Sequence, residues 1–208
     1  MENSKELFRE AIARLTPNLS EKDRVKQDEL LHEVFDEGKL LKDALNVSDQ
    51  TIEYLYSQAY RLYKIGKFKD SSRYFHILYL LNGADLRFSM GIAACHHMQK
   101  EYQRAVEWYL VCSALDADSP LPYYHISDCF LKMGEKISAL ISLKMMQVRL
   151  DANDDPQFAH IKERALRMME TLDEEIKNST VEDQFESKAM EAPLREEANQ
   201  EEAANTEK

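Results

Sequence analysis

Glycine and proline are scarce in this chain, with five of each among 208 residues. Sheet-rich folds need many tight turns, which these two residues largely supply, so the scarcity favours helices. No apolar run approaches the ~20 residues that a bilayer-spanning helix needs. The first 14 residues lack the apolar core of a signal peptide, about 7–15 residues long. We therefore expect a cytoplasmic protein that does not insert into membranes.

Basic residues are fewer than acidic ones, with 27 against 38, so the net charge is -11. Nucleic acids and anionic membranes should be repelled, so we expect neither as a partner. The three cysteines include no Cys-x-x-Cys pair, which fits a reducing compartment.

The acidic residues are concentrated near the carboxyl end of the sequence. Residues 178–208 carry nine acidic and three basic side chains, a net charge of -6, and their apolar periodicity is weak. This composition predicts an acidic disordered tail. A solvating role is the plainer interpretation, and a regulatory contact or mimicry of a client stays open.

A repeat of 34 residues organises the middle of the sequence. When Phe68 is aligned with Tyr102, small residues meet small residues and aromatic or large residues meet each other. The repeats span 52–85, 86–119 and 120–153. Each is predicted to form two antiparallel helices whose small residues allow close approach: Ala59, Ala93 and Ser127 on the first helix, and Ser71, Ala105 and Ala139 on the second.

These repeats predict an all-α tetratricopeptide-repeat superhelix, with an irregular helical bundle as the plainer alternative. We expect a flexible segment at 1–19 and a repeat domain at 20–177. Within that domain, a helix precedes the repeats and a helix at 156–177 caps them, because a terminal repeat would otherwise expose an apolar face. The leading helix carries an apolar stripe formed by Leu30, Leu31, Val34 and Phe35. We expect it to mediate self-association by packing against a second copy, or to pack against the first helix of repeat 1 in a monomer.

A concave groove is the expected binding surface, since the first helix of each repeat lines the inside of such a superhelix. Tyr56, Tyr60 and Tyr63 fall on one helix face, and aromatic side chains give large contact areas at low entropic cost. The alternative is that these tyrosines belong to the repeat core. The predicted client-binding residues are Tyr56, Tyr60, Tyr63, Phe68, Met90, His97, Met98, Tyr124 and Leu131.

Other functions have weaker support in the sequence. A carboxylate clamp needs Lys, Asn and Arg at places that hold Tyr56, Tyr60, Gly91, Leu121 and His125. A zinc site could draw on Cys95, His96, His125 and Cys129, but the two cysteines occupy a packing position. No phosphate-binding glycine loop or nucleophile elbow is present. We therefore expect no catalytic residues, no cofactor and no metal.

Three segments resemble one family more closely than tetratricopeptide repeats in general. They are residues 48–56, 85–95 and 122–129, which carry the patterns D-x-R-F…G…A-C in the second repeat and [FY]-[HY]…[DE]-C in the third. They resemble the type III secretion chaperones of translocator proteins, the SycD/LcrH/IpgC class. The resemblance covers about residues 35–175 and departs from the family at both ends.

The resemblance implies a concrete function. Such chaperones reside in the bacterial cytoplasm, bind an extended N-terminal segment of a hydrophobic translocator in the groove, and keep it soluble and competent for export. It also implies possible homodimers formed through the leading helix. A general tetratricopeptide scaffold or co-chaperone for another peptide is the alternative function.

Overall fold

The computed structural model describes residues 6–7, 9–10, 14, 20–152 and 155–178. These residues form helices joined by short turns and include no strand, which confirms the all-helical prediction. The chain divides into two compact units, Met1–Ala117 and Asp118–Lys208, and each is described by itself. Among the described residues, no helix is both long and apolar enough to cross a membrane.

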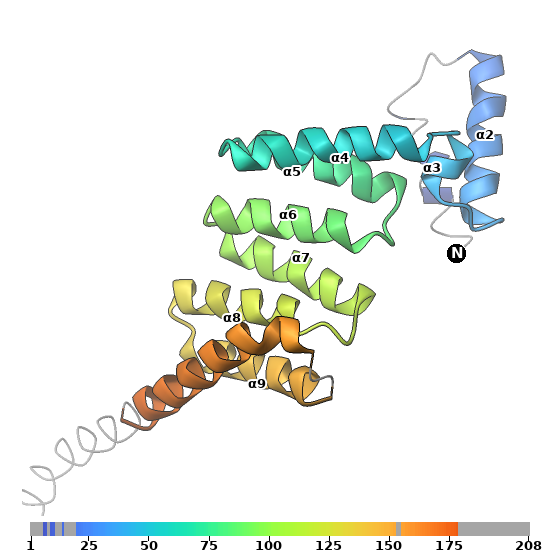
Figure 1. Ribbon diagram of the computed structural model, residues 1–208. Helices are drawn as coiled ribbons and strands as arrows, with labels where there is room; N and C mark the ends of the chain where they lie inside the picture. Colours follow the sequence, from blue (N-terminus) through green and yellow to red (C-terminus); the bar gives the residue numbers. More distant parts are fainter. Residues whose placement is uncertain (1–5, 8, 11–13, 15–19, 153–154, 179–208) are drawn as a thin grey trace, which may run out of the picture. The chain divides into compact units, whose positions relative to one another are not determined.

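The first unit contains two stacked helix pairs, visible in Figure 1. Helix α2 (Glu21–Phe35) and the short α3 (Leu41–Ala44) precede them. The first pair is α4 (Asp49–Lys64) with α5 (Phe68–Leu81), and the second is α6 (Leu86–Met98) with α7 (Tyr102–Leu115). The core between them is built on Ala59, Phe75, Leu78, Phe88, Ile92 and Cys95.

The second unit contains the third helix pair and the helix that covers it. Helix α8 (Leu121–Met133) is followed by α9 (Lys136–Ala152), by a 3-10 turn (Pro156–Phe158), and by a final helix over 159–178. Ile161, Ala165, Met169 and Leu172 of that final helix are buried with Leu143 and Met146 of α9. The predicted capping helix therefore covers an apolar face, and it starts three residues later than the sequence suggested.

The same turn closes the first helix of each pair at intervals of 34 residues. Gly66, Lys100 and Gly134 have φ values of 78°, 62° and 81°. The next residue in each case donates a backbone hydrogen bond to a carbonyl five positions earlier: Lys67 to Leu62, Glu101 to His96 and Glu135 to Phe130, at 2.9–3.0 Å. This left-handed cap satisfies carbonyls that the helix end leaves unpaired.

The small residues at matching repeat positions are buried, as predicted. Ala59, Ala93 and Ser127 on the first helices and Ser71, Ala105 and Ala139 on the second helices are all fully buried. In the first pair the Ser71 hydroxyl also donates to the Ala59 carbonyl at 2.8 Å. Larger side chains at these places would separate the helices, because protein interiors are close-packed.

The residues before the repeats are only partly described. Ser20 caps α2 by accepting a hydrogen bond from the Asp23 amide at 3.3 Å. Of the segment 1–19, residues 6–7, 9–10 and 14 are described and helical, and Arg9 pairs with Asp28 of α2 at 3.1 Å. Apart from residue 178, the last of the final helix, the predicted tail lies outside the described residues.

Candidate peptide-binding surface

Helix α4 presents a strip of aromatic side chains, which we call the aromatic strip: Tyr56, Tyr60, Tyr63 and, at the start of α5, Phe68. Tyr56 and Tyr60 stack with ring centroids 6.4 Å apart, and Tyr63 meets Phe68 edge-on at 5.4 Å. The strip forms because the tyrosines are spaced four and three residues apart along one helix. It offers several ring faces and hydroxyl groups in one continuous row.

Members of the aromatic strip differ in how far they reach into the core. Tyr60 is 47% exposed, whereas Tyr56 is half-buried and packs against Phe75 at 6.0 Å and Phe88 at 6.2 Å. Tyr63 is also half-buried, and burial raises the pKa of its hydroxyl. The sequence left groove and core as alternatives for these tyrosines. Tyr56 has features of both, because it packs against the core on one side and against the exposed Tyr60 on the other.

Helix α6 supplies three further predicted residues from the same unit. Met90 and His97 are half-buried, and Met98 is 51% exposed. The His97 ring meets Tyr102 edge-on at 5.8 Å and Tyr109 at 6.2 Å, so α7 holds it in place. Tyr102 is absent from the predicted binding residues, although its alignment with Phe68 at the 34-residue offset was a signal for including it.

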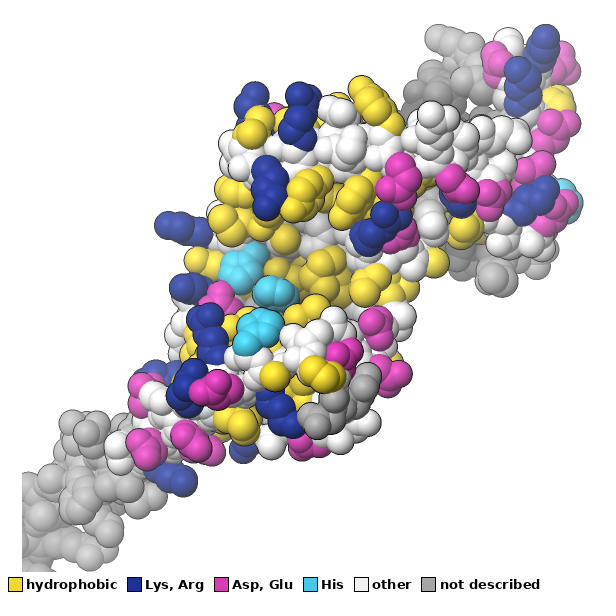
Figure 2. Space-filling model, viewed as in Figure 1, with side chains coloured by type: hydrophobic (Ala, Val, Ile, Leu, Met, Phe, Trp, Pro, Cys, Tyr) yellow, Lys and Arg dark blue, Asp and Glu magenta, His cyan; other side chains and the backbone are white. Residues whose placement is uncertain are grey.

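Charged side chains border the aromatic strip. Arg87 of α6 lies over the Tyr56 ring at 4.8 Å and pairs with Glu53 of α4 at 2.8 Å. Lys64 lies 5.2 Å from the Tyr60 ring centroid at the end of α4. Figure 2 shows hydrophobic side chains over α4 and α6 with basic and acidic side chains beside them. The surface is therefore suited to a segment that is mainly apolar with polar flanks.

The remaining predicted residues, Tyr124 and Leu131, belong to α8 in the second unit. Both are half-buried and pack on the core formed by α9 and the final helix. Arg164 lies 5.9 Å from the Tyr124 ring, and Leu131 lines a cavity of about 330 Å³ together with Arg164 and Met168. A single groove across all three repeats stays a prediction.

The cysteines behave as packed apolar side chains. Cys95, Cys112 and Cys129 are fully buried. Burial raises the pKa of the Cys95 thiol, and burial beside Asp128 raises that of Cys129 to about 12. Among the described residues, no three His, Cys, Asp or Glu side chains are grouped as metal ligands would be. A thiolate is thus disfavoured at these positions.

Comparison with known proteins identifies relatives across most of the folded region. No family model matches the chain. It is 31% identical over 126 residues to the low calcium response locus protein H of Yersinia pseudotuberculosis, covering 61% of this chain and 74% of that protein. It is 26% identical over 143 residues to the chaperone protein SicA of Salmonella dublin, covering 69% and 87%.

A solved structure shares the fold as well as sequence. The type III secretion chaperone SycD of Yersinia enterocolitica, in complex with a peptide of the translocator YopD, superimposes with a TM-score of 0.58 at 29% identity, covering 62% of this chain and 97% of SycD. The likeness confirms the tetratricopeptide-type helical fold expected from the 34-residue period. This chain belongs to the family of type III secretion translocator chaperones.

Proposed function

We propose that this chain is a bacterial cytoplasmic chaperone that binds an extended N-terminal segment of a hydrophobic translocator and keeps it soluble and competent for export. The observation that carries the proposal is the aromatic strip on α4, whose outermost ring, Tyr60, is 47% exposed. Support also comes from SycD, which is similar over most of its length and holds a translocator peptide.

The chemistry of the strip suits an extended peptide. Apolar side chains of such a peptide, for instance leucine or proline, can pack between the rings of Tyr56, Tyr60 and Tyr63, while tyrosine hydroxyls bond to its backbone. Met90 and Met98 on α6 extend the apolar area with adaptable side chains. The protein would act by binding alone and carry out no reaction on its client.

A general co-chaperone that grips a terminal carboxylate fits less well. Such a clamp requires cations and amides where α4 carries Tyr56 and Tyr60 and α6 carries Gly91. At these places the first unit offers aromatic and small side chains, so the cations and amides with which such a clamp binds a carboxylate are missing from their positions.

The decisive experiment compares Tyr60→Ala with Tyr54→Ala. Both tyrosines are exposed on α4, but Tyr54 points to a different side of the helix and lies outside the strip. Binding of labelled N-terminal translocator segments is measured by fluorescence anisotropy. Tyr60→Ala should lower affinity about 5- to 150-fold, a loss of 1–3 kcal/mol, with little change in melting temperature.

Tyr54→Ala should leave affinity unchanged. An equal loss for both variants, or no loss for Tyr60→Ala, would move the binding surface away from the strip. Tyr56→Ala should lower both affinity and melting temperature, because Tyr56 also packs against Phe75 and Phe88.

We also propose self-association through α2, by way of the stripe Leu30, Leu31, Val34 and Phe35. Leu31 is 3% exposed within a single chain, whereas Leu30 and Val34 keep half-exposed surfaces. Val34→Asp should therefore dissociate a dimer, and Val25→Asp, on the exposed side of the same helix, should not. Light scattering measures the molar mass in solution of the wild-type chain and of both variants. A monomeric wild-type chain would contradict the proposal.

A further inference from the structure

The second unit has a recess of about 330 Å³ between α8 and the final helix, which we call the apolar recess. Three apolar side chains line it, Leu131 of α8 and Met168 and Leu172 of the final helix. Leu172 is buried, whereas Leu131 and Met168 are half-buried and keep part of their surface open. Because ligand pockets usually measure about 300–1,000 Å³, the apolar recess has room for one or two side chains of a peptide.

Three charged side chains of the final helix also line the apolar recess, and two of them already have partners. Arg167 pairs with Glu163 at 2.7 Å, and Glu175 pairs with Lys136 of α9 at 3.0 Å. Arg164 forms no ion pair and no side-chain hydrogen bond with any residue that the structure describes. One cation beside the recess is therefore left for a ligand.

Tyr124 of α8 holds the Arg164 side chain beside the apolar recess. The guanidinium carbon lies 5.9 Å from the centroid of the Tyr124 ring, within the range of about 6 Å over which a cation is attracted to an aromatic face. A side chain restricted in this way loses less freedom when it binds a ligand. Arginine binds carboxylates through two parallel hydrogen bonds, so the recess suits a ligand that combines an apolar group with a carboxylate.

The spacing of the cation and the apolar side chains determines which peptide pattern fits. Arg164 and Met168 are four residues apart on the final helix, so they share one face and lie about 6 Å apart along its axis. In an extended peptide, residues two positions apart point to the same side and lie about 6.6 Å apart, whereas adjacent residues point to opposite sides. A peptide along this helix can therefore contact both with an apolar and an acidic residue that are separated by one residue.

We propose that the apolar recess binds an extended segment of the translocator client in which a bulky apolar residue and an acidic residue stand two positions apart. The apolar side chain enters beside Leu131 and Met168, and the carboxylate pairs with Arg164. Charge complementarity favours this occupant, because a purely apolar segment would leave Arg164 unpaired and a basic one would be repelled. The inference rests on the proposed function for its partner, and it adds a selection for acidic residues that the aromatic strip does not supply.

NMR of the full chain with carbon-13 in its methionine methyl groups tests the proposal, because Met168 lines the apolar recess while Met90 and Met98 lie on α6. Replacing each methionine by leucine in turn assigns the signals. The probes are capped glycine–serine peptides with one leucine and one glutamate two positions apart, with the two adjacent, or with glutamine in place of glutamate. The first peptide should shift the Met168 signal, and the other two should bind roughly fivefold more weakly, as expected for an exposed ion pair.

Arg164→Gln should abolish the preference for glutamate over glutamine, and Arg73→Gln, on α5, should retain it. Both arginines are exposed, so both variants should keep the wild-type melting temperature. An unmoved Met168 signal, equal binding of the glutamate and glutamine peptides, or a preference that survives Arg164→Gln would each overturn the proposal. Translocator segments that leave Met90 and Met98 unmoved would contradict the proposed function instead, while a Met168 shift with the first peptide would still support the recess chemistry.

Discussion

Arg87 on α6 donates a hydrogen bond to Glu53 on α4 at 2.8 Å, and the two residues are 34 positions apart, one full repeat. The same guanidinium lies over the Tyr56 ring at 4.8 Å and pairs with Asp85 at 2.7 Å. Residues at matching repeat positions therefore meet beside the aromatic strip. The ion pair holds a cation against one of the proposed binding rings.

Removing this ion pair should affect binding more than folding. Both side chains are about half exposed, so the pair should contribute less than about 1 kcal/mol to stability. We expect a double-mutant cycle with Glu53→Gln and Arg87→Met, measured by urea unfolding, to give a coupling energy in that range. Arg87→Met should also weaken client binding several-fold, because Tyr56 loses its neighbouring cation. A coupling energy above about 2 kcal/mol would contradict this account.

Lys100 occupies a backbone conformation that glycine adopts in the other repeats. Its φ of 62° matches 78° at Gly66 and 81° at Gly134, and a left-handed residue with a Cβ costs roughly 1 kcal/mol. Lys100→Gly should therefore stabilise the fold by about 0.5–1 kcal/mol. The control is Lys144→Gly, at an exposed position in the interior of α9, which should destabilise by a similar amount. Thermal unfolding distinguishes them, and a destabilising Lys100→Gly would contradict the prediction.

Lys100 also shows how much of the fold the repeat period could predict. The sequence has no glycine there, yet Lys100 lies 34 residues after Gly66 and 34 before Gly134, so the repeat period predicts a turn at this position, and the backbone has one. Helix pairs, buried small residues and the capping helix could be predicted in the same way, since each depends on local patterns. The period could also have identified Tyr102, which aligns with Phe68 and holds His97.

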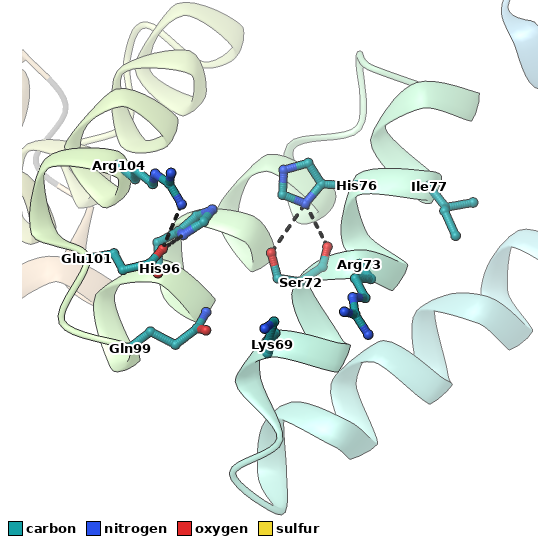
Figure 3. Close-up of a pocket in the computed structure, with 9 residues that line it drawn as sticks. All are labelled: Lys69, Ser72, Arg73, His76, Ile77, His96, Gln99, Glu101 and Arg104. Atoms are coloured by element: carbon teal, nitrogen blue, oxygen red, sulfur yellow. Dashed lines mark hydrogen bonds and ion pairs between the residues drawn. The ribbon is translucent and has the colours of Figure 1, made fainter. Parts of the chain in front are cut away.

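Other features of the site depend on contacts between residues of different helices, which no local sequence pattern predicts. The position of Tyr56 between surface and core follows from its contacts with Phe75 on α5 and Phe88 on α6. The recess lined by Ser72 of α5, His96 of α6 and Arg104 of α7 likewise combines side chains from three helices (Figure 3). Such groups become neighbours only through packing, so their spacing in the sequence gives no sign of them.

Gly91 illustrates a requirement that packing alone explains. A Cβ atom at this position on α6 would lie 2.6 Å from ring atoms of Phe75, far inside contact distance. Gly91→Ala should push the buried Phe75 ring aside and destabilise the fold by about 1–3 kcal/mol. Gly83→Ala is the control, because its nearest atoms lie at 3.4 Å or beyond. Urea unfolding measures the free energy of unfolding of both variants. Equal changes in the two would show that the Phe75 ring moves aside at no cost, and would contradict the prediction.

Asp85 should make stability depend on pH in acid. Hydrogen bonds from the Arg87 side chain hold the pKa of this carboxyl below its usual 3.8, and it caps α6 by accepting from the Arg87 amide at 3.0 Å. Because the folded pKa is depressed, the contribution is present above the unfolded value. It is lost as pH falls below 3.8 through the folded pKa.

The comparison with Asp85→Asn isolates the charge, since asparagine can still cap the helix. The variant should be less stable than the wild-type chain by about 1 kcal/mol near pH 6, as expected for a charge-assisted bond on a partly exposed side chain. The difference should shrink once the pH falls below 3.8. Carboxyl NMR titration supplies a direct check, because Arg87→Met should raise the Asp85 pKa. A stability difference that is constant from pH 6 to pH 2.5 would assign the effect to the cap and leave the charge without a role.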